Sequence, residues 1–301
     1  MMMKSNLGKL SLLSVVVFVM LACGFGPLTT SPSSGVQTQI AAGIQATLAA
    51  RGQATNPSAP ANSALPADLA KRMDAAKILV YEDVAGDPSL TPYVKTAIAS
   101  LPGDYTYLGD AMGTFMDKLT SDTPWDLIIM AAEMRETVSG GYWDLINDQV
   151  NKKVGLVAEM WYLDQINRGK ISPFLEECGI GFQKNWDRSA GANKVEYGMF
   201  WSMPDSPVFN SPNKVGQFKW SLNYWTGDAG DFVSLSPGSN AVILASHGEN
   251  NTHDYGLITS CLDGRVIVQT FASHDYPTDA MVALWQNYIT YTLSNHFKAL
   301  P

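Results

Sequence analysis

Charged side chains are scarce in this 301-residue sequence, where they make up 16% of residues against the usual quarter. The 20 Lys and Arg are outnumbered by 28 Asp and Glu, which gives a formal net charge of -8. Binding to nucleic acid needs a basic footprint, so this balance argues against a nucleic-acid partner. At 46% hydrophobic residues, the chain also carries too much apolar material for its charge to be disordered.

Long apolar runs are also scarce, and only one of them, Leu10–Ala22, could enter a bilayer, which argues against an intrinsic membrane enzyme. The run follows a short basic segment and is too short for a comfortable transmembrane helix, so it is typical of a signal peptide. It ends in Met20-Leu21-Ala22-Cys23. This ending resembles the lipobox of bacterial lipoproteins, although Met20 replaces the usual Leu.

The lipobox resemblance implies that residues 1–22 are removed and that Cys23 is diacylated. Two or three acyl chains would give stable membrane anchoring, and the protein would face outside the cytoplasm in the cell envelope. An ordinary secretory signal with an incidental cysteine, or an uncleaved anchor, is the alternative interpretation.

Cysteine is rare, and after Cys23 only Cys178 and Cys261 remain. An even pair in an oxidising compartment suits one disulfide, whereas two buried free thiols are the alternative. Neither cysteine has metal-ligand spacing, so a structural zinc site is not expected.

Residues 23–66 are expected to form a tether ahead of one folded unit at 67–301. Gly24–Ser34 is rich in Pro, Ser, Thr and Gly, and residues 52–65 form a second such linker. Between them, Val36–Arg51 has an apolar residue at every fourth position, which predicts a short helix with a narrow apolar stripe.

Short apolar runs recur in the folded unit at 78–81, 105–108, 127–132, 154–158 and 241–245. Because these runs are continuous rather than alternating, they predict strands covered on both faces, as in a parallel sheet. Helical stretches at 92–101 and 142–150 fall between them, so right-handed βαβ units are expected.

The C-terminal part departs from this pattern. The segments 256–261 and 265–271 flank Leu262-Asp263-Gly264, which predicts an antiparallel hairpin with an Asp-Gly turn. A final helix is expected from Thr278, with Val282, Trp285, Ile289 and Leu293 on its apolar face.

Residues 181–240 interrupt the alternation of predicted strands and helices. They contain 11 of the 31 aromatic residues and many Gly, Pro, Ser and Asn. We interpret them as an insertion that covers one end of the sheet. The aromatic side chains could form a lid with platforms for a sugar, but packing of the insertion onto the domain is the favoured interpretation.

Acids and imidazoles gather after the predicted strands, where parallel sheets bind ligands. The ligand-binding candidates are Glu82, Asp83, Glu133, Arg135, Trp161 and Asp164, and the catalytic candidates are Glu159, His247 and His274. Such a cluster suits general acid–base chemistry or a hard cation. Helix capping by the same acids is the structural alternative.

A family resemblance rests on three features: the first strand ends in Glu82-Asp83, Ser139-Gly140-Gly141 begins a helix after the third, and Gly264–Phe271 leads to His274-Asp275. The chain resembles the class I glutamine amidotransferase-like superfamily, and within it the trehalose-utilisation-type branch. The resemblance covers Lys77–Phe297 without the insertion. It implies a flavodoxin-like three-layer sandwich: a mostly parallel sheet with an antiparallel C-terminal edge.

The nucleophile elbow departs from this family. Amidotransferases carry Gly-x-Cys-x-Gly after the fourth strand, whereas this chain has Val157-Ala158-Glu159-Met160-Trp161 there. Without a thiol no thioester forms, so glutamine hydrolysis is not expected. Glu159 is expected at the centre of the site, with a pKa raised by neighbouring acids. Alternatively, it pairs with Arg135 or a backbone amide and only fixes the turn.

Three functions of different class follow. The first is a membrane-anchored module that binds a small polar ligand such as a carbohydrate. The second is a hydrolase in which a carboxylate and a histidine activate water, with a divalent metal as an option. A purely structural envelope protein is the third. No cofactor can be identified from the sequence motifs, and they name no protein partner.

Overall fold

The computed structural model describes residues 66–133, 139–188, 193–225 and 227–300. These residues belong to a compact unit that spans Ala64–Pro301. The expectations for the signal peptide, Cys23 and the tether therefore lie outside the described residues, as does Arg135. None of the described helices is both long and apolar enough to cross a membrane.

Five parallel strands form the centre of the domain, in the order β2-β1-β3-β4-β10. Their bounds are Lys77–Glu82 (β1), Asp104–Tyr107 (β2), Leu127–Ala132 (β3), Gly155–Met160 (β4) and Val266–Gln269 (β10). In chain order this is the flavodoxin-like sequence 2-1-3-4-5. The fold class expected from the sequence is confirmed.

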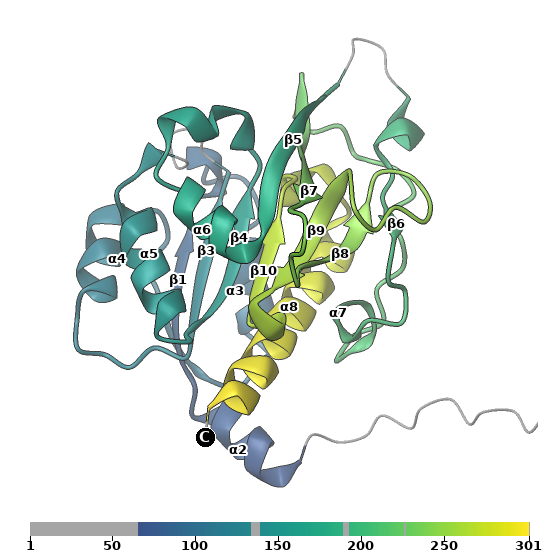
Figure 1. The fold of residues 1–301 in the computed structure, drawn as a ribbon. Helices are drawn as coiled ribbons and strands as arrows, with labels where there is room; N and C mark the ends of the chain where they lie inside the picture. The colour runs from purple at the N-terminus through teal and green to yellow at the C-terminus, as the bar shows by residue number, and fades with distance from the viewer. Residues whose placement is uncertain (1–65, 134–138, 189–192, 226, 301) are drawn as a thin grey trace, which may run out of the picture. The chain divides into compact units, whose positions relative to one another are not determined.

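Helices cover both faces of these strands (Figure 1). Along β1 the side chains alternate: Leu79 and Tyr81 belong to the core on one face of the sheet, whereas Ile78 and Val80 belong to the core on the other face. The first face is covered by α4 (Met112–Leu119), α5 (Tyr142–Asn151) and α6 (Ser172–Cys178). The second is covered by α2 (Ala67–Asp74), α3 (Tyr93–Ile98) and α8 (Thr278–Ala299). These are the three layers of the sandwich.

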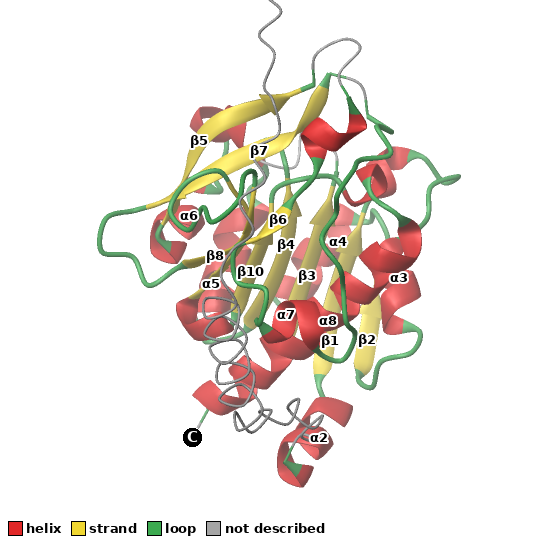
Figure 2. Ribbon diagram, turned by 90° about the vertical axis from the view of Figure 1, so that its right-hand side faces the viewer, coloured by secondary structure: helices red, strands yellow, loops and turns green. Residues whose placement is uncertain are grey.

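The antiparallel part of the sheet is larger than the hairpin that the sequence predicts. That hairpin is present as β9 (Gly256–Cys261) and β10, joined by the short 3-10 helix η5 (Leu262–Gly264). Beyond β9 the sheet continues antiparallel through β7 (Asp228–Leu235) and β5 (Ile180–Asp187), which lie side by side at the top of Figure 2.

The run at 241–245 is not a fifth parallel-paired strand. It forms β8 (Val242–Ser246), which pairs antiparallel with β9 and with β6 (Phe200–Trp201). All its residues except Val242 are buried. A buried strand has the same apolar pattern in either pairing, so its sequence could not reveal the direction of its neighbours.

The insertion at 181–240 is largely built into the domain. It contributes β5, β6 and β7, the 3-10 helix η4 (Lys194–Tyr197) and the short helix α7 (Pro207–Asn210). The buried core includes its aromatic side chains Trp186, Tyr197, Trp201 and Phe218. Packing, the favoured interpretation of these aromatics, therefore accounts for most of them.

A disulfide joins the end of α6 to the end of β9. Cys178 and Cys261 are bonded, with their Cα atoms 5.4 Å apart, and both are buried. Of the two alternatives for this pair, the structure has the disulfide.

Candidate active or ligand-binding site

Three acids lie on one face of the sheet because strand side chains alternate with a period of two. In β1, Glu82 lies on the same face of the sheet as Ile78 and Val80. In β4, Glu159 lies on the same face as Val157. Both acids are aligned in register with Ala131 of β3, and Glu133 follows two residues later. The carboxyl ends of β1, β3 and β4 thus present acids toward the layer of α3 and α8.

Glu82 uses both carboxylate oxygens to bind the start of α3. Its Oε1 accepts the backbone N–H of Val94 at 2.8 Å, and its Oε2 accepts the backbone N–H of Lys95 and the Tyr107 hydroxyl, both at 3.0 Å. A carboxylate at this position satisfies free N–H groups of the first helical turn. Burial still raises the pKa of Glu82, although these hydrogen bonds oppose the rise.

Glu159 ties β4 to the loop after β10. Its Oε1 accepts the backbone N–H of Ser273 at 2.7 Å, and its Oε2 accepts the Ser273 hydroxyl at 3.1 Å. The side chain is buried, and burial together with the charge of Glu133 raises its pKa well above the ordinary value. Glu159 is therefore a positioning group for the Ser273 loop.

Glu133 and His274 form the closest pair in the cluster, with Oε2 2.7 Å from Nδ1. His274 Nε2 lies 3.0 Å from the backbone oxygen of Thr91, which can only accept. We therefore assign a proton to Nε2, and one further proton lies between Glu133 and Nδ1.

That shared proton rests on Glu133 at neutral pH. Burial raises the pKa of Glu133 to about 8, with repulsion from Asp83 adding to the rise and the Glu159 side chain opposing part of it. Burial lowers the pKa of His274, so the imidazole is held neutral. The pair is then a carboxylic acid donating to a neutral imidazole.

A small cavity of about 10 Å³ lies among these groups. It has room for about one water molecule. Its walls include the acids Glu82, Glu133 and Glu159, with Tyr93, Ser273 and His274. Among the described residues, Glu133 Oε1 has no hydrogen bond of normal geometry. Oε1 is therefore the acceptor that a bound group could use. Within the described part of the chain, no three His, Cys, Asp or Glu side chains are arranged to hold a metal ion.

A row of aromatic rings lies beside this cluster, with an exposed tyrosine next to His274. The Tyr224 ring lies 6.1 Å from that of His274 and 5.0 Å from that of Trp225, which in turn lies 5.8 Å from Trp161. Tyr224 is 46% exposed, whereas Trp161 is buried. This row of rings places an accessible aromatic face next to the acidic cluster.

An internal ion pair fixes the segment that carries these rings. Arg188 Nη2 lies 2.6 Å from Asp275 Oδ2, and both side chains are almost fully buried. Arg188 also donates to the backbone oxygen of Trp225, whose N–H donates to Asp275 Oδ1 at 3.2 Å. The 3-10 helix η6 (Ser273–Asp275), which carries His274, is thereby joined to the Tyr224–Trp225 segment.

The structure brings together four of the predicted site residues and separates others. Glu82, Glu133, Glu159 and His274 line one cavity, and Asp83 lies beside it, accepting the backbone N–H of Glu133 at 2.9 Å.

His247 lies apart from that cavity, with its ring 5.3 Å from Trp186 and 5.4 Å from Phe232. Asp164 is in the 3-10 helix η3 (Leu163–Arg168), and its backbone N–H donates to Asp231. Trp161 does not line that cavity, and its ring lies 5.8 Å from that of Trp225 in the row of rings.

The turn after β4 is two residues later than the sequence suggested. The predicted strand ends at Ala158, but β4 continues through Glu159 and Met160, which pair with Ala131 and Ala132 of β3. The residue at the turn is therefore Trp161, and Glu159 points from within a strand. Glu159 does bind a backbone amide, but that amide belongs to Ser273 rather than to its own turn.

Sequence reasoning missed Thr91, Tyr93, Arg188 and Ser273. Ser273 directly precedes His274, which was a predicted site residue, so its position in the sequence could have indicated it. Arg188 is 87 residues from Asp275, and no pattern in the sequence indicated that these two residues pair. Tyr224 and Trp225 were included only as members of the aromatic-rich insertion.

No protein-family model and no curated protein matches this chain. Solved structures with a similar course of the chain include a protein described as part of a GMP synthase, from Thermoplasma acidophilum. It has 9% identity and a TM-score of 0.43, covering 74% of this chain and 96% of the other. PurLQS from Thermotoga maritima has 9% identity and a TM-score of 0.39, covering 74% and 99%. A glutamine amidotransferase from Thermotoga maritima has 10% identity and a TM-score of 0.36, covering 74% and 96%.

Proposed function

We propose that this protein is a membrane-anchored, extracytoplasmic lipoprotein whose α/β domain binds a small polar ligand, such as a carbohydrate, without hydrolysing glutamine. The binding site is the edge formed by Glu133, His274 and Tyr224. The observation that carries the proposal is that the acids and the imidazole of this cluster are already engaged in holding loops.

General acid–base catalysis needs a group that is free to exchange a proton with the substrate. Both oxygens of Glu82 and both of Glu159 accept hydrogen bonds from the protein, and both nitrogens of His274 have partners. Glu133 Oε1 is the exception. In the neutral acid this atom is a carbonyl oxygen, which suits it to accept a hydrogen bond from a ligand hydroxyl.

The exposed Tyr224 supports a ligand with an apolar face and several hydroxyl groups. Small-molecule sites combine aromatic walls with a few polar groups that fix orientation. Tyr224 offers the wall, and the Arg188–Asp275 pair holds its segment in place. The water-sized cavity beneath would take a single hydroxyl rather than a whole sugar ring.

Absence of a thiol supports the exclusion of glutaminase chemistry. A thioester requires a free cysteine at the reacting centre. The chain turns after β4 at Trp161, and both Cys178 and Cys261 are used in the disulfide.

Water-based hydrolysis is the second candidate, favoured by one specific observation. The cavity has room for a water molecule and is flanked by Glu133 and Glu159, whose pKa values are both raised. Carboxyl groups with strongly raised pKa values are typical of catalytic sites. A divalent metal is an option within this second candidate, and it rests on the acidic character of the cluster alone.

Binding is tested by titrating the full chain with a panel of mono- and disaccharides and recording heat and melting temperature. A ligand that binds the native state raises its melting temperature. We expect Tyr224→Ala to abolish the response to any active sugar. Tyr255→Ala is the matched control, because Tyr255 is also exposed, at 39%, and its ring packs on Phe232 rather than on His274. Loss of response in both variants, or in neither, would reject Tyr224 as the platform.

A further inference from the structure

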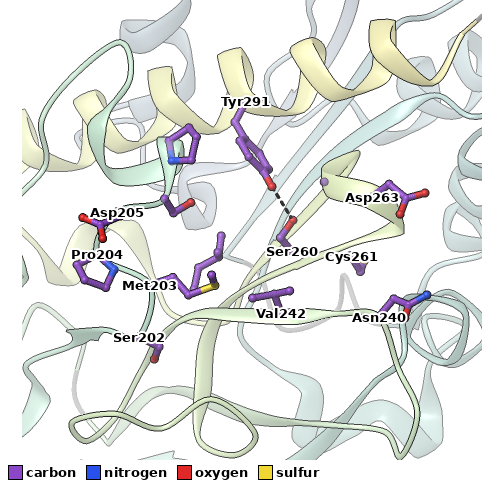
Figure 3. Close-up of a pocket in the computed structure, with 14 residues that line it drawn as sticks. Ser202, Met203, Pro204, Asp205, Asn240, Val242, Ser260, Cys261, Asp263 and Tyr291 are labelled. Carbon is purple, nitrogen blue, oxygen red and sulfur yellow. Dashed lines mark hydrogen bonds between the residues drawn. The ribbon is translucent and has the colours of Figure 1, made fainter. Parts of the chain in front are cut away.

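A second, larger cavity of about 580 Å³ lies away from the acidic cluster (Figure 3). Its walls come from the insertion at 202–207, from β8, from the end of β9 with η5, and from Tyr291 of α8. Its volume falls in the range of small-molecule sites. The proposed carbohydrate site does not use any of these residues.

The insertion wall is held rigidly by hydrogen bonds. Asn210 donates to the backbone oxygens of Pro204 at 2.7 Å and Ser206 at 2.9 Å. The backbone N–H groups of Ser202 and Met203 donate to Leu244 at 2.9 and 3.2 Å. This side of the cavity is therefore preformed and needs little ordering when a ligand binds.

The interior of the cavity is apolar. Met203 and Val242 line it and are 42% and 39% exposed, so two apolar side chains stand open to solvent. Figure 3 shows them on the same side of the hollow, with Tyr291 above them. A flexible methionine beside an aromatic ring suits an apolar body of variable shape.

The charge around the cavity has one sign. Among the described residues, those that line it include Asp205 and Asp263 and no Lys, Arg or His. Arg265 acts electrostatically on Asp263, but it also acts on Glu177 and is not part of the wall. Asp205 makes no side-chain hydrogen bond or ion pair within the part of the chain that the structure describes. An occupant with a positive charge would complement this rim.

We propose that this cavity binds a small organic cation with an apolar body, such as an arylalkylamine. The apolar part would lie against Met203, Val242 and Tyr291, and the ammonium group would face Asp205.

The test uses the full chain and three probes of matched size: phenethylamine, 2-phenylethanol and phenylacetate. Titration calorimetry should show saturable binding of phenethylamine and at least fivefold weaker binding of the other two. Asp205→Asn should weaken phenethylamine binding about two- to fivefold, as expected for a solvent-exposed ion pair. Asp254→Asn, at an exposed aspartate outside the cavity wall, should leave it unchanged.

Blocking the cavity provides the second arm. Val242→Arg should abolish saturable binding while leaving the melting temperature unchanged, because Val242 is exposed. Met203→Lys provides the same block from the insertion segment if the first variant does not fold. Equal binding of phenylacetate, absence of saturable phenethylamine binding, or binding that survives both blocking substitutions would overturn the proposal.

Discussion

Glu133 Oε2 lies 2.7 Å from His274 Nδ1, and this contact joins the end of β3 to a loop 141 residues later in the chain. Both side chains are almost fully buried. Because the other imidazole nitrogen faces a backbone oxygen, the contact holds one proton, and burial keeps that proton on the acid at neutral pH. The Glu133–His274 contact is thus a hydrogen-bonded joint between two strand ends.

The first prediction concerns the pH dependence of stability at Glu133. The pKa of Glu133 is raised from 4.5 to about 8 on folding. Its stabilising contribution to the free energy of unfolding is therefore fully present below pH 4.5 and is lost as the pH rises through about 8. Glu133→Gln resembles the protonated acid and cannot ionise. We expect denaturant unfolding to give the variant a stability near that of wild type at pH 4 and a growing advantage up to pH 8. A variant that is clearly less stable than wild type at pH 7 would indicate an ionised Glu133 instead.

Asp231 gives an independent test of how a carboxyl pKa raised by burial makes stability depend on pH. It is buried, Oδ1 has no hydrogen-bond partner among the described residues, and burial raises its pKa from 3.8 to about 8. The stabilising contribution of Asp231 to the free energy of unfolding is therefore present below pH 3.8 and is lost as the pH rises through about 8. Asp231→Asn should gain stability over wild type as the pH rises through this window. Thermal melts at pH 4, 6 and 8 check this, with exposed Asp254→Asn as the control, and parallel curves for wild type and variant would contradict it.

The disulfide is expected to stabilise the domain substantially. Cys178 and Cys261 are 83 residues apart, and closing a loop of that length in the unfolded chain corresponds to about 4 kcal/mol in the chain-entropy model. Replacing both with Ser should lower the free energy of unfolding by about 2–4 kcal/mol. Reductant should destabilise wild type and leave the double variant unchanged. Thiol titration in denaturant provides the check, since two reactive thiols at these positions before reduction would show that the bond is absent.

Anchoring is tested at Cys23. We expect mass spectrometry of the membrane-extracted protein to find Cys23 diacylated at the new N-terminus and residues 1–22 absent. Cys23→Ser should leave the protein unprocessed or release it from membranes. An intact Met1 on wild-type protein from the membrane would disprove the lipoprotein assignment.

Much of the central sheet could be predicted from the sequence because continuous apolar runs mark its buried parallel strands. The acids at 82, 133 and 159 were found for the same reason, since they end those runs. By contrast, β5 was missed because it is largely half-buried and carries polar residues such as Gln183, Lys184 and Asn185, a pattern also typical of a loop.

Strand direction and long-range contacts could not be read from local patterns. His247 was grouped with Glu159 because β8 was expected beside the other parallel strands, whereas β9 and β10 separate β8 from β4. Likewise, the contact between the His274 ring and the backbone oxygen of Thr91, 183 residues away, arises only from the tertiary fold. Our proposal of binding rather than catalysis is argued from these contacts, so sequence reasoning alone left that choice open.

The most direct test of the central claim compares Glu133→Gln with wild type for both affinity and turnover of an active sugar. In the neutral acid Oε2–H donates to His274 and Oε1 accepts from the ligand, and the glutamine amide can reproduce both hydrogen bonds. We predict that at pH 6.5 the variant retains the affinity within about twofold, that Glu133→Ala loses it, and that neither wild type nor variant converts the sugar to product by NMR. Conversion of the sugar by wild type, abolished in Glu133→Gln, would contradict the binding account and establish Glu133 as a catalytic base.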